Sequence, residues 1–391
     1  MTALVIGGGI GGPVAAMALR QAGIEATVFE AYDRTAEGVG GALSIAPNGL
    51  RALRVIGLDE AVRAIGTPIT AMAMQSWTGK TLGAFTSDPA QLLVWRQDLY
   101  RVLSEEAARR GVETVLGKRL VDAVSSPDGV RARFADGSVA RGDILIGADG
   151  IRSTVRGLVD PAAPRPRYAG LLGFGANVAD TGLPSTRGRM NLVFGKRAFF
   201  GYQVLDDSSG GWFANLPRRT PVSAAEVRAT GPAEWLDILR AAFADDRTPA
   251  VAMIDRASPD ELVVTGPLED IPSVPTWSRD RMVLVGDAAH ATSPSSGQGA
   301  SLAIESAVEL ARCLRDLPHP QAFRTYEGLR RERVERIIAM AARTNQNKAA
   351  GPVVRVIRDL VMPVAMKFGN PAKYTWQFDH SIDWESSLVT A

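Results

Sequence analysis

Short apolar runs that end at glycine or acidic residues dominate the first 150 positions. Residues 2–6, 25–29 and 144–147 have the continuous apolar character of buried parallel strands. Between the first two runs, apolar residues from 13 to 22 precede Gly23, which is typical of a helix that ends at a glycine. The pattern predicts a β-α-β unit at the start of a parallel sheet.

The middle of the chain has a different pattern. Residues 71–85 alternate between apolar and polar positions around Thr78-Gly79, as in a β-hairpin. Three further segments are strand-like and rich in aromatic residues, namely 190–194, 198–204 and 211–216. We therefore expect a second, mostly antiparallel sheet between residues 168 and 276.

The C-terminal third returns to the first pattern and then becomes helical. A buried strand is predicted at 282–285, followed by helices at 300–314, through 343, and from Gly351 toward 368. Pro363 and Asp359 favour packing of the last helix against the protein over a position on a membrane surface.

These elements predict an α/β fold in which a Rossmann-like domain is interrupted by a second domain and then resumed. An amphipathic helix at 98–110 and a three-stranded meander at 120–141 belong to the Rossmann-like part. The expected boundaries are a discontinuous nucleotide-binding domain at 1–68, 97–165 and 277–345, a mostly antiparallel substrate domain at 69–96 and 166–276, and a C-terminal helical segment at 346–391.

Composition narrows the function classes. The 391 residues carry a net charge of only +2, which gives no reason to expect nucleic acid or an anionic membrane as partner. Cys313 is the single cysteine, and the three histidines lie far apart, so neither a disulfide nor a metal site is predicted. The start of the chain is uncharged, but it contains many glycines and lacks the basic residues that begin a signal peptide. We therefore interpret it as a strand and a turn, and we expect a cytoplasmic protein.

The first candidate site is a glycine motif between the first strand and the first helix. Gly7, Gly9 and Gly12 have the GxGxxG spacing, which allows a tight turn, close approach of a pyrophosphate and close packing of helix on strand. Glu30 follows at the end of the next strand, where an acid can accept the ribose hydroxyls of an adenosine. The motif predicts a dinucleotide site and leaves FAD and NAD both open.

Two later segments carry a resemblance to a known family. Residues 143–156 read DILIGADGIRSTVR, and residues 281–300 read RMVLVGDAAHATSPSSGQGA. With the glycine motif, they resemble the three fingerprints of the single-component FAD-dependent aromatic hydroxylases, the group A flavoprotein monooxygenases with the p-hydroxybenzoate hydroxylase fold. The resemblance covers nearly the whole chain and is weakest at 168–270.

The resemblance implies non-covalently bound FAD and a role for each matching residue. Asp287, after Gly286, would bind the ribityl hydroxyls, and Pro294 would lie along the flavin ring. Asp149, followed by Gly150, would support the FAD phosphates and transient nicotinamide binding, and Arg96 would reach FAD. The remaining positions would place the start of a helix at the flavin ring, namely Gly297, Gln298, Gly299 and Ala300.

The activity implied by the resemblance is a monooxygenase reaction. NADPH or NADH would reduce FAD, and O2 would form a flavin C4a-hydroperoxide that hydroxylates or epoxidises an aromatic or polycyclic substrate. The alternatives are an FAD-dependent dehydrogenase or reductase, a halogenase, and a non-catalytic flavin-binding protein. The halogenase alternative is weakened because residues 212–217 read WFANLP and lack the second Trp of the halogenase motif. Monomer and homodimer both remain open.

The substrate pocket is expected between the flavin and the antiparallel sheet. Candidate lining residues are Met72, Met74, Phe174, Met190, Phe194, Phe199, Tyr202 and Trp212. Arg197 and Tyr202 are the candidates for binding a phenol or a carboxylate. Relatives often carry a Trp-Arg pair where this chain has Gly173-Phe174-Gly175, which argues against a small acidic substrate.

Overall fold

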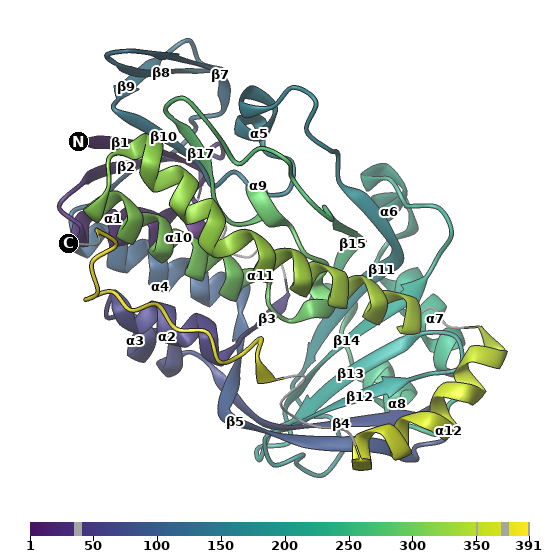
Figure 1. Ribbon diagram of the computed structural model, residues 1–391. Helices are drawn as coiled ribbons and strands as arrows, with labels where there is room; N and C mark the ends of the chain where they lie inside the picture. Colours follow the sequence, from purple (N-terminus) through teal and green to yellow (C-terminus); the bar gives the residue numbers. More distant parts are fainter. Residues whose placement is uncertain (35–40, 349–350, 369–374, 390–391) are drawn as a thin grey trace.

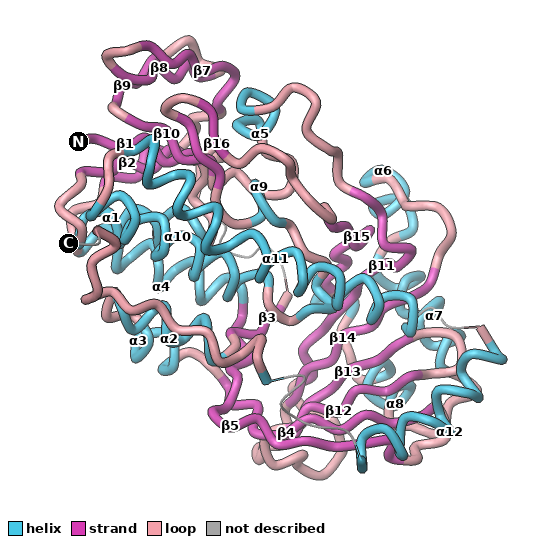
Figure 2. The backbone as a smooth tube through the Cα atoms, viewed as in Figure 1, coloured by secondary structure: helices cyan, strands magenta, loops and turns pink. Residues whose placement is uncertain are grey.

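The computed structural model describes residues 1–34, 41–348, 351–368 and 375–389. Its elements form a six-stranded sheet packed against helices and, beside it, an eight-stranded sheet (Figure 1). A separate three-stranded sheet lies at the far end of the first sheet (Figure 2). The α/β class and the division into two sheets agree with the sequence-based expectation.

The six-stranded sheet has the order β16-β17-β10-β1-β2-β6 and is parallel except for the β16-β17 pair. Its strands are β1 (Thr2–Ile6), β2 (Glu25–Phe29), β6 (Glu113–Val115), β10 (Ile144–Gly147), β16 (Ser278–Arg279) and β17 (Met282–Leu284). The central strands are buried almost throughout, because helices pack on the sheet. The predicted β-α-β unit is confirmed.

Most of the helices belong to this part of the molecule. They are α1 (Gly11–Gln21), α2 (Pro47–Val55), α3 (Asp59–Ala64), α4 (Arg96–Arg109), α5 (Thr154–Val159), α9 (Asp287–His290) and α10 (Gly299–Asp316). The predicted meander is also present as β7 (Leu120–Ser126), β8 (Gly129–Phe134) and β9 (Val139–Gly142). Helices α1 and α10 pack against each other, so the two predicted helix starts lie in one region of the fold.

The eight-stranded sheet has the order β15-β11-β14-β13-β12-β4-β5-β3. Its strands are β3 (Ala42–Ile45), β4 (Thr67–Ser76), β5 (Thr81–Trp95), β11 (Arg167–Val178), β12 (Arg189–Phe194), β13 (Phe199–Val204), β14 (Gly210–Pro217) and β15 (Val263–Asp270). All pairs are antiparallel except β4-β12, which is parallel. Strand β3 was not predicted, and it joins this sheet at the edge nearest the nucleotide-binding part.

The expected antiparallel sheet is present, but the segment after β14 is helical, which was not predicted. This segment forms α6 (Ala224–Thr230), α7 (Pro232–Phe243), α8 (Ala250–Asp255) and the short 3-10 turn η1 (Pro259–Glu261). In α7 the buried residues Trp235, Leu236, Leu239 and Phe243 recur at helical spacing. They cover one face of the eight-stranded sheet and form its core.

Two long helices follow α10, namely α11 (His319–Lys348) and α12 (Pro352–Phe368). Helix α11 runs from the six-stranded sheet to the eight-stranded one (Figure 1). Helix α12 contacts β5, and its Met362 joins an apolar cluster with Phe194 and Phe199. The predicted packing of this helix is confirmed on that face, while Val353, Val356, Leu360 and Val364 are more than half exposed. Within the described part of the chain, no helix has the length and apolar character needed to cross a membrane.

Candidate active site

The glycine motif forms a turn that has no room for side chains at two of its three glycines. Gly7 has a φ of +110°, and a Cβ placed there would lie 2.5 Å from the Ala148 carbonyl oxygen. A Cβ on Gly12 would lie 1.9 Å from the carbonyl oxygen of Gly7, so α1 packs directly on the end of β1. At Gly9 a Cβ would meet no atom within 4 Å. Two glycines therefore close the turn, and the third leaves backbone open to a ligand.

Glu30 lies beside this turn at the end of β2. Its Oε2 accepts a hydrogen bond from the backbone N–H of Gly8 at 2.6 Å, and its Oε1 accepts one from that of Tyr32 at 3.0 Å. The carboxylate thus holds the glycine turn and remains only partly buried. This position is suited to a ribose next to a pyrophosphate at the turn.

Asp149 anchors the loop after β10. Its carboxylate accepts hydrogen bonds from the Ser153 hydroxyl at 2.5 Å and from the backbone N–H groups of Thr154 and Val155 at 2.7 and 3.1 Å. Burial raises the pKa of Asp149, and these hydrogen bonds oppose that effect. The side chain therefore fixes the start of α5, and it is the neighbouring Gly150 that borders the cavity described below.

Arg156 connects this loop to the third motif. The guanidinium is buried and donates to the carbonyl oxygens of Ile151 at 2.6 Å and Ala288 at 3.2 Å. Because Ala288 belongs to α9, Arg156 links the loop after β10 to the loop after β17.

Asp287 is the first residue of α9 and follows Gly286, whose φ is +58°. Burial raises the pKa of Asp287, and the positive charge of Arg96 opposes this. Arg96 begins α4, and its Nε donates to the Tyr100 hydroxyl at 3.0 Å. Both side chains line the same cavity, so the structure brings these two sequence-predicted residues together.

The segment after α9 contains the 3-10 turn η2 (Pro294–Ser296) and the start of α10. Pro294, Gly297, Gln298, Gly299 and Ala300 all line the cavity. Gly297 has a left-handed φ of +62°, and its carbonyl oxygen accepts a hydrogen bond from Ser44 of β3 at 3.0 Å. The first N–H groups of an 18-residue helix carry partial positive charge, which favours an electron-rich ligand at this point.

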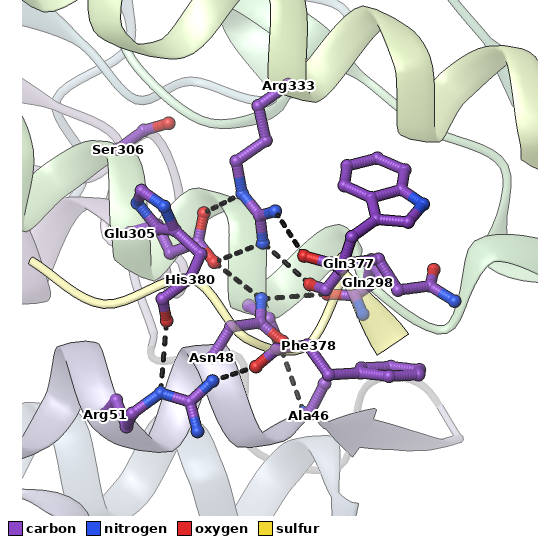
Figure 3. Close-up of polar contacts among 12 residues, drawn as sticks. Ala46, Asn48, Arg51, Gln298, Glu305, Ser306, Arg333, Gln377, Phe378 and His380 are labelled. Carbon is purple, nitrogen blue, oxygen red and sulfur yellow. Dashed lines mark hydrogen bonds and ion pairs between the residues drawn. The ribbon is translucent and has the colours of Figure 1, made fainter. Parts of the chain in front are cut away.

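A buried polar network supports the start of α10 (Figure 3). Glu305 is 1% exposed, and its carboxylate contacts Arg330 at 2.5 Å, Arg333 at 3.0 Å and the Asn48 amide at 2.6 Å. Asn48 also donates to the side-chain oxygen of Gln298 at 3.0 Å. Burial alone would raise the pKa of Glu305, but the two arginines outweigh burial and lower the pKa to about 2. Glu305 is therefore an anion that holds α2, α10 and α11 together. They meet around residues 297–299, where the chain enters α10, which we call the Gln298 turn.

The same network holds the C-terminal segment, residues 375–389. Arg333 donates to the carbonyl oxygen of Gln377 at 2.7 Å, and Arg51 donates to those of Phe378 and His380 (Figure 3). Thr375, Gln377 and Phe378 border the cavity next to the Gln298 turn. Sequence reasoning gave this segment no role in the site.

A single cavity of about 2040 Å³ connects the three motifs to the eight-stranded sheet. One end is lined by the glycine turn, Gly150, Asp287 and the start of α10, and the other by Met72, Met74, Met190, Phe194 and Phe199. These five apolar residues were predicted as lining residues. The cavity is thus continuous from the nucleotide-binding turns to an apolar, aromatic wall.

Of the four other predicted substrate residues, Phe174 and Trp212 border the cavity but have their rings packed in a core, and Tyr202 and Arg197 do not border it. Phe174 packs on Trp235, and Trp212 stacks on Phe200, so both side chains belong to the core on the far face of the sheet. Tyr202 lies in that same core. Arg197 forms an ion pair with Asp245 at 3.1 Å and donates to the Ala241 carbonyl oxygen at 2.6 Å. We therefore withdraw Arg197 and Tyr202 as candidates for substrate binding.

Sequence reasoning missed many cavity residues, among them Phe213, Asn215 and Lys348. Phe213 and Asn215 could have been found from the alternation along β14. They point to the face of the strand opposite to that of Trp212 and Ala214. Lys348 ends a long polar helix, where nothing in the local pattern distinguishes it from a solvated lysine.

Comparisons with known proteins agree with this arrangement. The family described as "FAD binding domain" matches residues 1–192 and 272–341. The chain is 31% identical over 354 residues to the aurachin C monooxygenase/isomerase of Stigmatella aurantiaca, with 88% of this chain and 89% of that protein covered. It is 33% identical over 354 residues to the FAD-dependent urate hydroxylase of Klebsiella pneumoniae subsp. pneumoniae, with 87% and 88% covered.

A solved structure extends the likeness to three dimensions. HpxO of Klebsiella pneumoniae, crystallised with FAD and uric acid, matches with a TM-score of 0.84 and 28% identity. The match covers 97% of this chain and 96% of that chain. The chain therefore belongs to the FAD-binding domain family, among the FAD-dependent monooxygenases of the aromatic hydroxylase type.

Proposed function

We propose that the protein binds FAD non-covalently and uses NADPH or NADH and O2 to hydroxylate or epoxidise an aromatic or polycyclic small molecule. The observation that carries this proposal is the continuous cavity of about 2040 Å³, with nucleotide-binding turns at one end and an apolar wall at the other. Pockets for one small ligand commonly measure about 300–1,000 Å³. The space therefore suits a cofactor together with a substrate.

The chain's own residues bind and orient both molecules. The turn at Gly9 and the side chain of Glu30 suit the pyrophosphate and the adenosine ribose, and Asp287 suits hydroxyl groups of the ribityl chain. The start of α10 would stabilise negative charge on the reduced ring. FAD, when bound, supplies electron transfer and oxygen activation, which protein side chains cannot provide.

The apolar wall has the second task of excluding water. Met72, Met74, Phe194 and Phe199 offer no hydrogen bonds to solvent and would surround the reacting part of the substrate. Two relatives are named for urate and aurachin C, which supports a heteroaromatic ring as the part that is oxygenated.

The nicotinamide cofactor is proposed to bind only transiently. The sequence contains no second GxGxxG motif that would form a separate nicotinamide domain. We propose that the nicotinamide approaches the flavin through the cavity, and that the protein acts in the cytoplasm as a monomer or homodimer.

The decisive experiment follows the oxygen atoms. FAD-loaded protein, NADPH or NADH, and a panel of bicyclic hydroxyaromatic compounds are incubated under ¹⁸O2, and products are analysed by mass spectrometry. We expect one labelled atom per product molecule and NAD(P)H consumption coupled to product. Consumption that gives only labelled water or peroxide would identify an oxidase or reductase, halide-dependent products a halogenase, and absence of NAD(P)H oxidation a non-catalytic flavin-binding protein.

Asp287→Ala is expected to weaken FAD binding by about 10- to 150-fold, because a charge-assisted hydrogen bond contributes about 1.5–3 kcal/mol. Stability of the FAD-free protein should not fall, since the raised pKa of Asp287 shows that its buried charge is unfavourable without a partner. Flavin fluorescence titration measures the affinity, and urea unfolding of the FAD-free protein measures the stability. Asp237→Ala, at an exposed position on α7, is the control. Equal FAD affinity in the Asp287 and Asp237 variants would contradict the role of Asp287.

A further inference from the structure

Lys348 ends α11 and places an amine at the boundary between the two parts of the cavity. Its Nζ donates to the side-chain oxygen of Asn215 on β14 at 2.7 Å and to the Ser295 hydroxyl in η2 at 2.9 Å. Asn215 belongs to the wall of the eight-stranded sheet, and η2 belongs to the loop that leads into α10. The amine therefore joins the substrate wall to the loop along the proposed flavin ring.

The surroundings of this amine are aromatic and uncharged. Nζ lies 4.1 Å from the ring centroid of Phe199 and 5.8 Å from that of Phe213. Among the described residues, no carboxylate lies within ion-pair distance of Lys348. Burial without such a partner lowers the pKa of Lys348 to about 7. The amine therefore loses its proton more easily than an ordinary lysine, and its neutral form can accept one.

Charged groups on the adjacent elements are engaged elsewhere. On α12, Arg358 pairs with Asp359 at 2.7 Å and lies over the ring of Phe194 at 4.3 Å. On α11 itself, the nearest preceding charged residue is Arg343. The strand β14 and the turn η2 contain no charged residue, and they present Asn215, Ser295 and the ring of Phe213 to the amine.

The amine retains capacity for a ligand. A lysine ammonium has three donors, and Asn215 and Ser295 accept two of them. The cavity, which Lys348 lines, is the space from which a third partner can come. A partner that arrives as a neutral hydroxyl and leaves its proton on nitrogen would also remove the cost of a buried unpaired charge.

We propose that Lys348 is a catalytic residue that binds an acidic hydroxyl group of the substrate and accepts its proton. The O–H bond breaks, its electron pair stays on oxygen, and the proton forms a new N–H bond on Nζ. The product is an ammonium–phenolate pair over Phe199, and the proton returns to oxygen before product release. This inference rests on the proposed function, because a phenolate ring is richer in electrons and reacts more readily with an electrophilic oxygen donor.

The chemistry selects the substrate class. A simple phenol such as the tyrosine side chain has a pKa of about 10, well above that of this amine. Hydroxyl groups on fused or electron-poor heteroaromatic rings are more acidic and match the amine better. The substrate that fits this proposal is a hydroxylated bicyclic or heteroaromatic compound, with its hydroxyl group at Lys348 and its rings on the apolar wall that borders the same cavity.

The test uses two probes that differ by one acidic proton. Binding of 7-hydroxycoumarin and 7-methoxycoumarin to the FAD-loaded protein is measured by equilibrium dialysis, and the absorbance of the bound hydroxycoumarin reports whether it is the anion. We expect the wild type to bind the hydroxy probe as the anion and to prefer it by about tenfold or more, as one charge-assisted hydrogen bond provides. Its affinity should be highest between the pKa of Lys348 and that of the probe, because the complex contains one shared proton.

Substitutions of Lys348 separate this role from packing. Lys348→Met should lose the preference for the hydroxy probe while methoxycoumarin binding changes by less than about twofold. Lys348→Arg stays protonated, so its affinity for the hydroxy probe should rise with pH to a plateau without a fall above it. Lys348→Gln replaces the Met variant if that variant does not retain FAD.

Several results would overturn the proposal. They are equal hydroxycoumarin affinity in the wild type and the Met or Gln variant, a bound probe that stays neutral, or wild-type protein that binds neither probe or both equally. Failure of the proposed function gives a different result. In that case the wild type binds the hydroxycoumarin anion through Lys348, but no substrate of the panel acquires ¹⁸O.

Discussion

Replacing Glu305 by glutamine is expected to lower the free energy of unfolding by about 3–5 kcal/mol, because it leaves buried cations without their anion. Arg330 is fully buried, and its guanidinium contacts the Glu305 carboxylate at 2.5 Å. Arg333 contacts the same carboxylate at 3.0 Å. Glutamine keeps the size of the side chain and removes only the charge, so the loss measures electrostatics and not a cavity.

Urea unfolding of the FAD-free protein measures this effect without a contribution from ligand binding. Because the pKa of Glu305 is lowered in the folded protein to about 2, its stabilisation is present above its ordinary pKa and is lost as the pH falls toward 2. The stability difference between wild type and variant should therefore shrink below the ordinary range for glutamate. The control is Glu105→Gln, in an exposed pair with Arg101, which should change stability by less than about 1 kcal/mol. A Glu305 variant as stable as this control would show that the network is not a stabilising ion cluster.

Gly12→Ala is expected to abolish FAD retention during purification. The added Cβ would lie 1.9 Å from the Gly7 carbonyl oxygen, and both atoms belong to the backbone or are fixed to it, so the turn itself must move. Loss of two or more charge-assisted hydrogen bonds to a pyrophosphate, at about 1.5–3 kcal/mol each, weakens binding by at least about 150-fold. Flavin absorbance per protein and a fluorescence titration give the measurement.

Gly328→Ala is the matched control for this substitution. Gly328 is an exposed helical position where a Cβ would meet no atom within 4 Å, so alanine should leave FAD binding unchanged and raise helix stability by up to about 1 kcal/mol. FAD binding by the Gly12 variant at wild-type strength would mean that the turn adapts, and that its close packing is not required for the cofactor.

The nucleotide-binding part was predictable because its sequence signals are local. Gly12 is required by its contact with Gly7 inside the motif, Gly7 by its own φ of +110° and by Ala148 on the adjacent strand end, and Glu30 reaches the same turn from β2. The parallel strands are buried on both faces, so an apolar run predicts such a strand without an assignment of one face to the core. For these reasons motif spacing and strand pattern predicted turns that the structure brings to one cavity, through Gly9, Gly150 and Asp287.

The substrate wall was less predictable because alternation does not reveal which face of a strand meets which neighbour. On β14, Trp212 was selected over Phe213, but α7 and α8 cover the Trp212 face and leave Phe213 toward the cavity. The same helices account for Tyr202, which packs behind the sheet. Because these helices were not predicted, the strand pattern could not indicate which face of the sheet they cover.

Lys348 shows a second limit of sequence reasoning. Its low pKa follows from desolvation by Phe199, Phe213 and the η2 turn, which lie far from it in sequence. The local sequence around it is polar and typical of a solvated helix end. Only the packing of α11 across both sheets distinguishes this lysine from the others.

The arginine contacts to residues 375–389 make completion of the site dependent on the order of synthesis. The glycine turn at residues 7–12 is translated first, whereas the segment whose carbonyl oxygens bind Arg51 and Arg333 is translated more than 360 positions later. During translation the Gln298 turn therefore lacks one of its supports until that segment has left the ribosome. The wall of the cavity beside the Gln298 turn is thus completed only after the elements that form the rest of the cavity have been translated.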